Sequence, residues 1–347
     1  MARIVIDKPG QLTTVQDFGR PALRRAGFPT GGAVDRVALR LANLLVGNAE
    51  NTAALECALV GPVLRFTHDI DIAITGAHAS GLPHRQRFRV HAGERVNLSR
   101  LDAGAYAYVA IAGGIDVPEV LGSRSTDVRL HFGGYNGRML RTGDELTVLN
   151  ASNGSVTDPT RFQRPSDFSR HVPASTGSSS RPRTDISPIG PKTADLHDRP
   201  PGTAIRILPA PDADRLPIDW PLAPFTISSK SDRVGVRLDG PQFTITTHPT
   251  AASGPVFPGT IQLPPDGVPI VLLADAQTLG GYPQIGHVIS VDLPRLAQTR
   301  PGHAVRFEPV TLDEAHRLAR RQERAFAFLR YGLRATMPGG ADDRPQL

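Results

Sequence analysis

Short apolar runs, separated by Gly, Pro and Asp, recur along most of the chain. In the first half they are Ile4–Ile6, Ala53–Leu59, Val63–Phe66, Ile70–Thr75, Arg87–Val90, Glu94–Leu98 and Tyr106–Ile111. In the second half they are Ala204–Leu208, Phe225–Ser228, Phe243–Thr246, Gly259–Leu263, Ile270–Leu273, Val288–Val291 and Ala304–Pro309. Runs of this length between turn-forming residues are typical of strands. The pattern predicts a mainly β protein.

Two segments have helical periodicity instead. Asp35 is placed to cap the first helix, and Gly47 lies where that helix should end. Thr311 and Glu314 form a capping-box pattern at the start of the second. The predicted apolar faces are Val37, Leu41, Leu44 and Leu45 in the first helix, and Leu312, Ala315, Leu318 and Ala319 in the second. Several arginines on the second helix favour a solvated face or a partner contact.

One short pattern, a Gly turn followed by an alternating strand, occurs three times. It lies at Ala92–Leu98, Thr142–Val148 and Pro301–Phe307. Such a strand can help to close a barrel. The stretch from about Ala151 to Pro200, after the second copy, is rich in Ser and Pro and predicts a disordered linker. We therefore expect a first barrel at 1–150, a linker at 151–202, a second barrel at 203–310, and a helix and tail at 311–347.

Composition narrows the class of protein. Gly (34) and Pro (32) are frequent, which suits many turns. The net charge is +6, but the arginines are scattered and aromatics make up only 5%, so a nucleic-acid surface is not expected. The single Cys57 has apolar neighbours, which favours packing over nucleophilic chemistry. No signal peptide or apolar run of about 18 residues is present, so we expect a cytoplasmic chain without a membrane span.

The densest polar segment is Asp275–Pro283. The apolar strand before it delivers Asp275, and Gln277, Thr278, Gly280, Gly281 and Tyr282 follow. Paired glycines allow a backbone to approach a ligand closely. The segment is therefore either a small-molecule site or a hairpin turn whose polar side chains bond to its own backbone. Arg233 and Gln262 are further candidates, as an anion clamp and as a polar group on a strand.

Several motifs are missing from the sequence. It contains no P-loop for ATP, no dinucleotide-binding Gly-x-Gly-x-x-Gly between a strand and a helix, and no Gly-x-Ser-x-Gly elbow. The 11 His residues have no metal-ligand spacing, so no metal site is predicted.

The motifs together resemble a known family. They are Thr14–Arg20, Asp35–Asn48, Leu55-Glu56, Ala112–Pro118, Leu121–Thr126, Ser231–Arg233, Gly235, Gly240-Pro241, Ile261–Gly267 and Gly280–Pro283. In order and spacing they are similar to the carboxyltransferase-domain family. That family includes the C subunit of 5-oxoprolinase, the KipA-type protein, the second subunit of allophanate hydrolase and a domain of urea amidolyase.

The resemblance implies two cyclophilin-like β-barrel subdomains with a cleft between them. It implies a partner, the B subunit, of related fold and, in the oxoprolinase, a further A subunit. ATP is used by the assembled complex to convert 5-oxo-L-proline to L-glutamate. On this basis Asp275 and Tyr282 are catalytic candidates. The substrate-binding candidates are Gln262, Gln277, Thr278, Gly280, Gly281 and Arg233.

The chain departs from the family pattern at two positions of the loop. Relatives often have a basic residue after the loop Asp and another after Tyr-Pro, where this chain has Ala276 and Gln284. An oxyanion would lose charge-assisted bonds there. Three hypotheses follow: the C subunit of an ATP-dependent 5-oxoprolinase, a biotin-dependent carboxyltransferase for urea or a related amide, or a KipA-type regulator that binds a kinase-inhibitor partner.

Overall fold

The computed structural model describes residues 1–149, 196, 202, 204–245 and 253–336, without the side chains of 334–336. The predicted linker at 151–202 lies outside this range except for Leu196 and Gly202, as does the tail beyond 336. Leu196 is buried in an apolar cluster.

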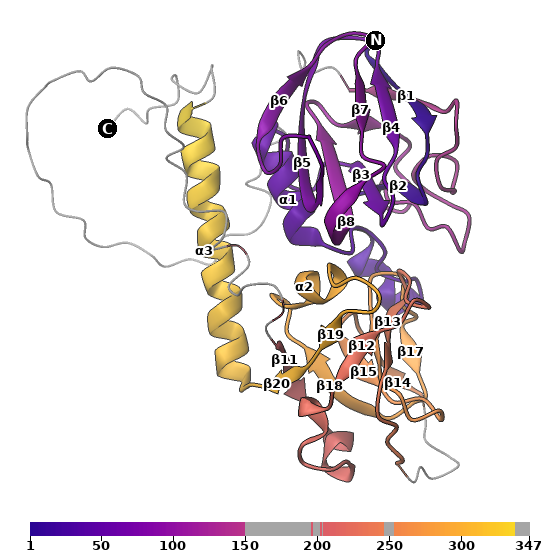
Figure 1. Cartoon of the computed structure of the whole chain (residues 1–347), viewed down its shortest axis with the longest axis vertical. Coiled ribbons are helices and arrows are strands. Elements are labelled where there is room, and N and C mark those ends of the chain that lie inside the picture. The colour runs from indigo at the N-terminus through magenta and orange to yellow at the C-terminus, as the bar shows by residue number, and fades with distance from the viewer. Residues whose placement is uncertain (150–195, 197–201, 203, 246–252, 337–347) are drawn as a thin grey trace, which may run out of the picture.

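The first half of the chain forms two five-stranded sheets, seen in indigo to magenta in Figure 1. One sheet has the order β7-β4-β1-β10-β9, and the other β2-β3-β8-β5-β6. Their apolar faces share one core that contains Ile4, Leu64 and Ile72. The strands are β1 (Arg3–Lys8), β2 (Leu12–Gln16), β3 (Ala54–Ala58), β4 (Val63–Phe66), β5 (Ile70–Ala79), β6 (Arg87–Val90), β7 (Arg95–Asn97), β8 (Leu101–Ile111), β9 (Ile115–Asp116) and β10 (Glu145–Val148).

The second half forms an eight-stranded sheet in the order β19-β12-β13-β16-β15-β18-β11-β20, with a separate β14–β17 pair. Its core includes Phe225 and Phe307, whose ring centroids lie 6.1 Å apart. The strands are β11 (Ile205–Pro209), β12 (Phe225–Ile227), β13 (Gly235–Asp239), β14 (Gly254–Pro255), β15 (Thr260–Gln262), β16 (Ile270–Leu272), β17 (Leu279–Gly280), β18 (Gln284–Val288), β19 (Ala304–Val305) and β20 (Phe307–Pro309). The mainly β fold is thus as predicted, with a few short helices: η1 (Pro21–Ala26), η5 (Pro211–Arg215), η6 (Trp220–Leu222) and α2 (Leu293–Ala297).

Two strand predictions are wrong. Phe243–Ile245 is not a strand; the Phe243 ring packs against Phe225, and its amide donates to the Gly267 carbonyl. The strand expected at Val288–Val291 lies earlier, at Gln284–Val288. Gly286 interrupts its apolar pattern because there is little room for a side chain there: a Cβ atom would lie 3.2 Å from Cδ1 of Ile261.

The three Gly turns do precede strands as predicted. Gly93, Gly143 and Gly302 have φ of 84°, 87° and 81°, a region that favours glycine. The strands that follow them are β7, β10 and β19.

Helix α1 (Arg36–Leu45) begins and ends as the sequence predicts. The Asp35 carboxylate accepts a hydrogen bond from the Ala38 amide at 2.8 Å. At the other end Gly47 and Asn48 donate to the carbonyls of Leu44 and Asn43, a Schellman pattern. The predicted apolar face is buried at Val37 and Leu41, which pack on helix α3 (Leu312–Thr336). A second buried face, with Ala38, Leu39 and Ala42, packs in the core that includes residues of both halves.

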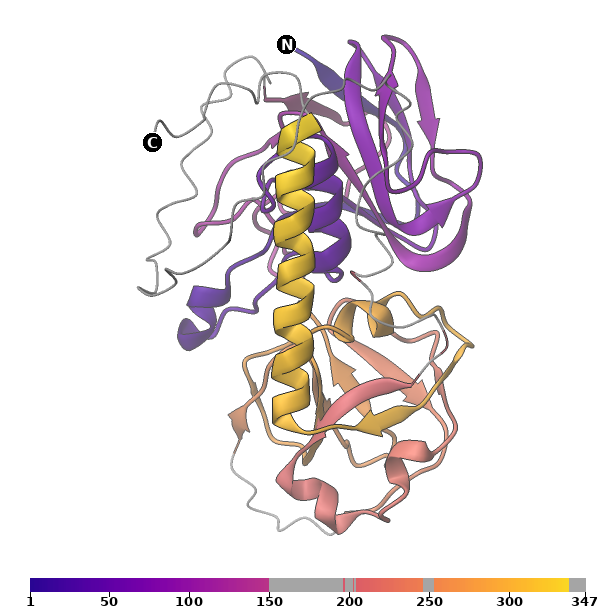
Figure 2. The same ribbon diagram turned by 90° about the vertical axis from the view of Figure 1, so that its left-hand side faces the viewer.

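Helix α3 (Leu312–Thr336) runs alongside both halves of the chain (Figures 1 and 2). Thr311 caps it by accepting from the Glu314 amide at 3.2 Å. Near its start, Ala315 and Leu318 pack against Ile289 and Val291. Further along, Phe326 and Leu329 pack against α1. The predicted stripe is wrong at Leu312, which is 56% exposed because it lies in the first turn, before the helix reaches the sheet.

Gln298, just after α2, joins the second half to the first. Its amide oxygen accepts from the Ala105 and Tyr106 amides at 2.9 and 3.0 Å. Its amide nitrogen donates to the Tyr106 carbonyl and to the Asp35 carboxylate, both at 2.8 Å. These peptide groups of β8 are available because the β5–β8 pairing is irregular between Gly76 and Ala79. Gln298 of the second half therefore supplies hydrogen-bond partners that are missing in a sheet of the first half.

This contact predicts a difference between two glycine substitutions. Gly93→Ala and Gly104→Ala both place a side chain at positive φ, which costs about 1–2 kcal/mol. Only Gly104 is crowded: its Cβ would lie 2.7 Å from Oε1 of Gln298, whereas nothing lies within 4 Å at Gly93. We expect Gly104→Ala to lower the free energy of unfolding by about 1–3 kcal/mol more than Gly93→Ala. Denaturant unfolding measures this, and equal losses would contradict the contact.

Candidate functional site at the interface of the two halves

Arg233 and Asp275, both predicted site residues, bind each other at the interface. Arg233 lies in the turn before β13, and Asp275 follows β16. Nε and one terminal nitrogen of Arg233 donate to the two Asp275 oxygens at 2.8 and 2.9 Å. Both side chains are buried. A bidentate pair of this kind holds both groups in a fixed geometry.

Glu56, on β3 of the first half, completes a buried triad with this pair. Its Oε1 accepts from Arg233, and its Oε2 accepts from the Tyr108 hydroxyl at 2.6 Å and from the Val34 amide at 2.9 Å. Burial raises the pKa of Glu56, while the Arg233 guanidinium, the Tyr108 hydroxyl and the Val34 amide act in the opposite direction. The triad thus ties the two halves together through charge.

Within the structure, Arg233 is occupied by the protein's own acceptors. Four of its five N–H groups donate to Asp275, to Glu56 and to the Gly32 carbonyl. The anion that this arginine holds is therefore internal, and its predicted role toward a substrate stays a prediction. The same holds for Asp275 as a catalytic group. What the geometry shows is that the pair fixes where the loop 275–283 begins.

A second group of predicted residues lies beneath the β14–β17 pair. Gln262 is buried on β15, and its amide nitrogen has no hydrogen-bond partner among the described residues. Gln277 approaches its amide oxygen at 3.5 Å, which is a long contact. Gly280 passes so close that a Cβ would lie 2.5 Å from Nε2 of Gln262. Position 280 therefore has room only for glycine, because the Gln262 side chain packs against it.

The remaining loop positions differ in exposure. Tyr282 is 49% exposed, and Gly281 lies near the Ser253 hydroxyl. Ala276, directly after Asp275, is fully buried against Val256 and Leu272. The structure thus places Arg233 and Asp275 in one cluster and Gln262, Gln277 and Gly280 in another. Tyr282 belongs to neither.

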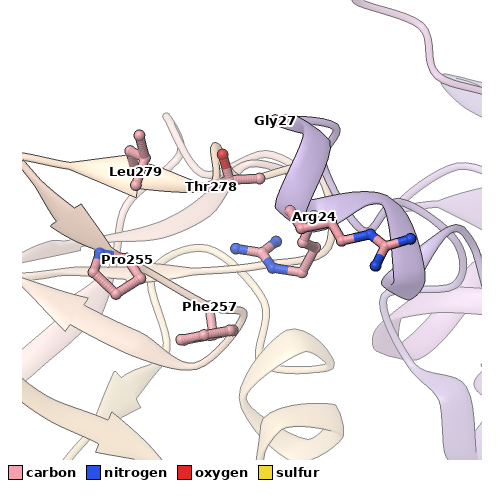
Figure 3. A pocket seen from close by; sticks show the side chains of 7 residues that line it. Arg24, Gly27, Pro255, Phe257, Thr278 and Leu279 are labelled. Carbon is pink, nitrogen blue, oxygen red and sulfur yellow. The ribbon is translucent and has the colours of Figure 1, made fainter.

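A cavity of about 300 Å³ lies where this loop faces the first half (Figure 3). Thr278 and Leu279 of the loop line it together with residues from the β14 region and from η1. The other lining residues are Arg24, Arg25, Gly27, Pro255 and Phe257. Small-molecule sites commonly occur at domain interfaces, and this volume is at the lower end of their range. The geometry therefore offers a place for a small ligand.

Arg24 is a functional candidate that the sequence analysis missed. Its guanidinium crosses to the second half, donates to the Val256 carbonyl and lies 5.1 Å from the centroid of the Phe257 ring. It also donates to the Thr30 hydroxyl at 3.1 Å. Burial lowers the pKa of Arg24. The signal in the sequence was the Arg24-Arg25 pair between Pro21 and Gly27, at the start of a loop.

Comparison with known proteins now decides the family. A model of the carboxyltransferase domain, subdomain A and B, matches residues 26–309. The chain belongs to the carboxyltransferase-domain family. The matched range includes the triad, the loop 275–283 and every residue that lines the cavity except Arg24 and Arg25. The cavity is therefore built mainly from the family domain, with its two cations just before the matched range.

Two curated relatives in this family have nearly the same length. The C subunit of 5-oxoprolinase from Haemophilus influenzae is 36% identical over 320 residues, covering 89% of this chain and 92% of the relative. The C subunit of 5-oxoprolinase from Escherichia coli K12 is 36% identical over 339 residues, covering 94% and 98%. The crystal structure of the K. lactis urea amidolyase has a TM-score of 0.77 and 30% identity, over 94% of this chain but only 20% of that protein. Family members are thus named as subunits or parts of enzymes.

Other kinds of site find little support in the described residues. Within them no three His, Cys, Asp or Glu side chains are grouped to hold a metal ion, and no helix is long and apolar enough to cross a membrane. Cys57 is buried as predicted, and burial raises the pKa of its thiol to about 12, so the thiolate is not available at neutral pH.

The triad predicts the effect of removing its cation. Arg233→Met leaves two buried carboxylates without a charge partner, so we expect a loss of about 3–5 kcal/mol in the free energy of unfolding. Burial raises the pKa of Glu56, and loss of Arg233 raises it further. At low pH Glu56 is protonated and costs the folded state little. As pH rises from its unfolded pKa through its folded pKa, the variant progressively loses stability because the buried carboxyl group resists ionisation. The variant should therefore fall further below wild type at pH 8 than at pH 6. Thermal unfolding at both pH values tests this, and Arg233→Lys, which keeps the charge, should lose less.

Proposed function

We propose that this chain is the C subunit of an ATP-dependent 5-oxoprolinase and that the interface cavity binds the small substrate, 5-oxo-L-proline. The observation that carries the proposal is that two C subunits of 5-oxoprolinase match this chain over 92% and 98% of their own length. The cavity supports it, because its volume suits a small molecule. The partner A and B subunits then complete the enzyme.

The chemistry to be done is the opening of a five-membered lactam by water, which produces L-glutamate. ATP hydrolysis drives this step in the assembled complex, and the cavity at about 300 Å³ does not suit ATP, which carries a base, a sugar and three phosphates. We therefore assign ATP to the partner subunits. This chain would contribute binding: Phe257 and Leu279 shield the ring from water, and the Thr278 hydroxyl offers a hydrogen bond.

In this proposal Asp275 acts by position. Held by Arg233, it fixes the start of the loop so that Thr278 and Leu279, three and four residues later, face η1. The adjacent Ala274 carbonyl accepts from the Gly31 amide of the first half at 2.8 Å, which holds the same point of the loop. Tyr282, on the exposed end of the loop, remains a candidate for a contact with substrate or with a partner protein.

Filling the cavity should reduce turnover without unfolding the chain. Leu279 is 60% exposed, so Leu279→Trp can be accommodated by the fold while its indole occupies space in the cavity. We expect at least about a tenfold loss in ATP-dependent glutamate formation by the assembled subunits, since misplacement of a substrate by about 1 Å can cost a hundredfold.

The matched control is Leu222→Trp, at a leucine that is 64% exposed and does not line the cavity. It should keep wild-type turnover. Full activity of Leu279→Trp, or undiminished turnover when this chain is omitted from the complex, would refute the proposal.

A second candidate is a carboxyltransferase for urea or a related small amide. It is favoured by the TM-score of 0.77 to the K. lactis urea amidolyase over 94% of this chain. Because the chain spans only 20% of that protein, a biotin carrier and a biotin carboxylase would have to be separate partners. Urea-dependent consumption of ATP and bicarbonate by a complex purified with this chain would support this candidate. If no such consumption is observed, the carboxyltransferase candidate is rejected and the 5-oxoprolinase proposal remains.

A further inference from the structure

The interface cavity has an uneven distribution of charge. Its wall from the first half carries Arg24 and Arg25, whereas the wall from the second half is formed by Pro255, Phe257 and Leu279 with the single hydroxyl of Thr278. None of the residues that line it is acidic. Neither arginine forms an ion pair with a described carboxylate, so this wall of the cavity favours an anionic ligand.

The two arginines have different tasks. Arg24 is largely engaged in joining the halves through the Val256 carbonyl, the Thr30 hydroxyl and the Phe257 ring. Only its Nε is left buried without a partner in the part of the chain that the structure describes. Arg25 is exposed and has no ion-pair partner among the same residues. Arg25 is thus the guanidinium that can turn toward a ligand, with Nε of Arg24 as a further donor.

The loop 275–283 contains no basic residue that could supply positive charge to the cavity. Ala276 points into the packing of Val256 and Leu272, and Gln284 is neutral and donates its amide to the Pro255 carbonyl at 3.2 Å. Positions 276 and 284 therefore carry no cation. The charge that the loop lacks lies across the interface, on η1.

We propose that Arg25 is the residue that recognises the anionic group in this cavity and that the ligand class is a small organic carboxylate with a compact ring or apolar body. One available guanidinium matches one carboxylate bidentately. The apolar opposite wall suits the body of such a ligand better than a free phosphate ion, which has no apolar part. This inference rests on the proposed use of the cavity by the substrate.

Direct binding to the full chain, alone and with its partner subunits, tests this. By calorimetry we expect 5-oxo-L-proline to bind more tightly than its uncharged amide, 5-oxo-L-prolinamide. Arg25→Gln should weaken binding of the acid by about ten- to a hundredfold and leave the amide nearly unchanged, as expected for loss of a charge-assisted pair. Arg25→Lys should recover part of the affinity for the acid, and higher salt should weaken wild-type binding.

The matched control is Arg306→Gln, at an exposed arginine outside the cavity, which should bind the acid like wild type. Equal affinity of Arg25→Gln and wild type for the acid, tighter binding of inorganic phosphate than of the acid, or no binding by either the chain or the complex would overturn the inference. If the complex cleaves 5-oxoproline with an unchanged KM in Arg25→Gln, this inference fails and the proposed function stands. If Arg25-dependent binding is found without turnover, this inference stands and the proposed function fails.

Discussion

The buried guanidinium of Arg233 is the interaction on which the arrangement of the two halves depends. A charge in the interior must be paired, and here its partners come from both sides of the interface, Asp275 from the second half and Glu56 from the first. Sliding one half over the other would leave at least one carboxylate unpaired in a place that water does not reach. The triad therefore permits one relative position of the two barrels, and the start of the loop 275–283 is fixed with it.

The cavity follows from that fixed position. Its walls belong to different halves, and neither wall alone encloses a volume. Because Arg24 reaches from η1 to the Val256 carbonyl, the distance across the cavity is set by a hydrogen bond as well as by the triad. A site divided in this way can combine a cationic wall and an apolar wall that no single strand or loop would carry. It also explains how a loop without its own basic residues can still face positive charge.

Much of the fold could be predicted from the sequence, because strand periodicity and helix caps are local signals. Asp35, Gly47 and the three Gly turns act within a few residues of their own positions. The errors have a cause in tertiary packing: Gly286, which packs closely against Ile261, interrupts the apolar pattern of β18. The candidate site could be predicted from the sequence only in part, for the same reason. Glu56 and Arg233 are 177 positions apart, and nothing local indicates that they meet.

The irregular pairing of β5 and β8 has a consequence for how the chain folds. The peptide groups of Ala105 and Tyr106 obtain their partners from Gln298, which is about two hundred residues further along and is synthesised much later. Until then only water can bind these peptide groups, and they lack the fixed partners that Gln298 supplies. The first barrel thus reaches its final stability only when the second has formed. The hydrogen bonds of Gln298 thus couple the stability of the first barrel to the folding of the second.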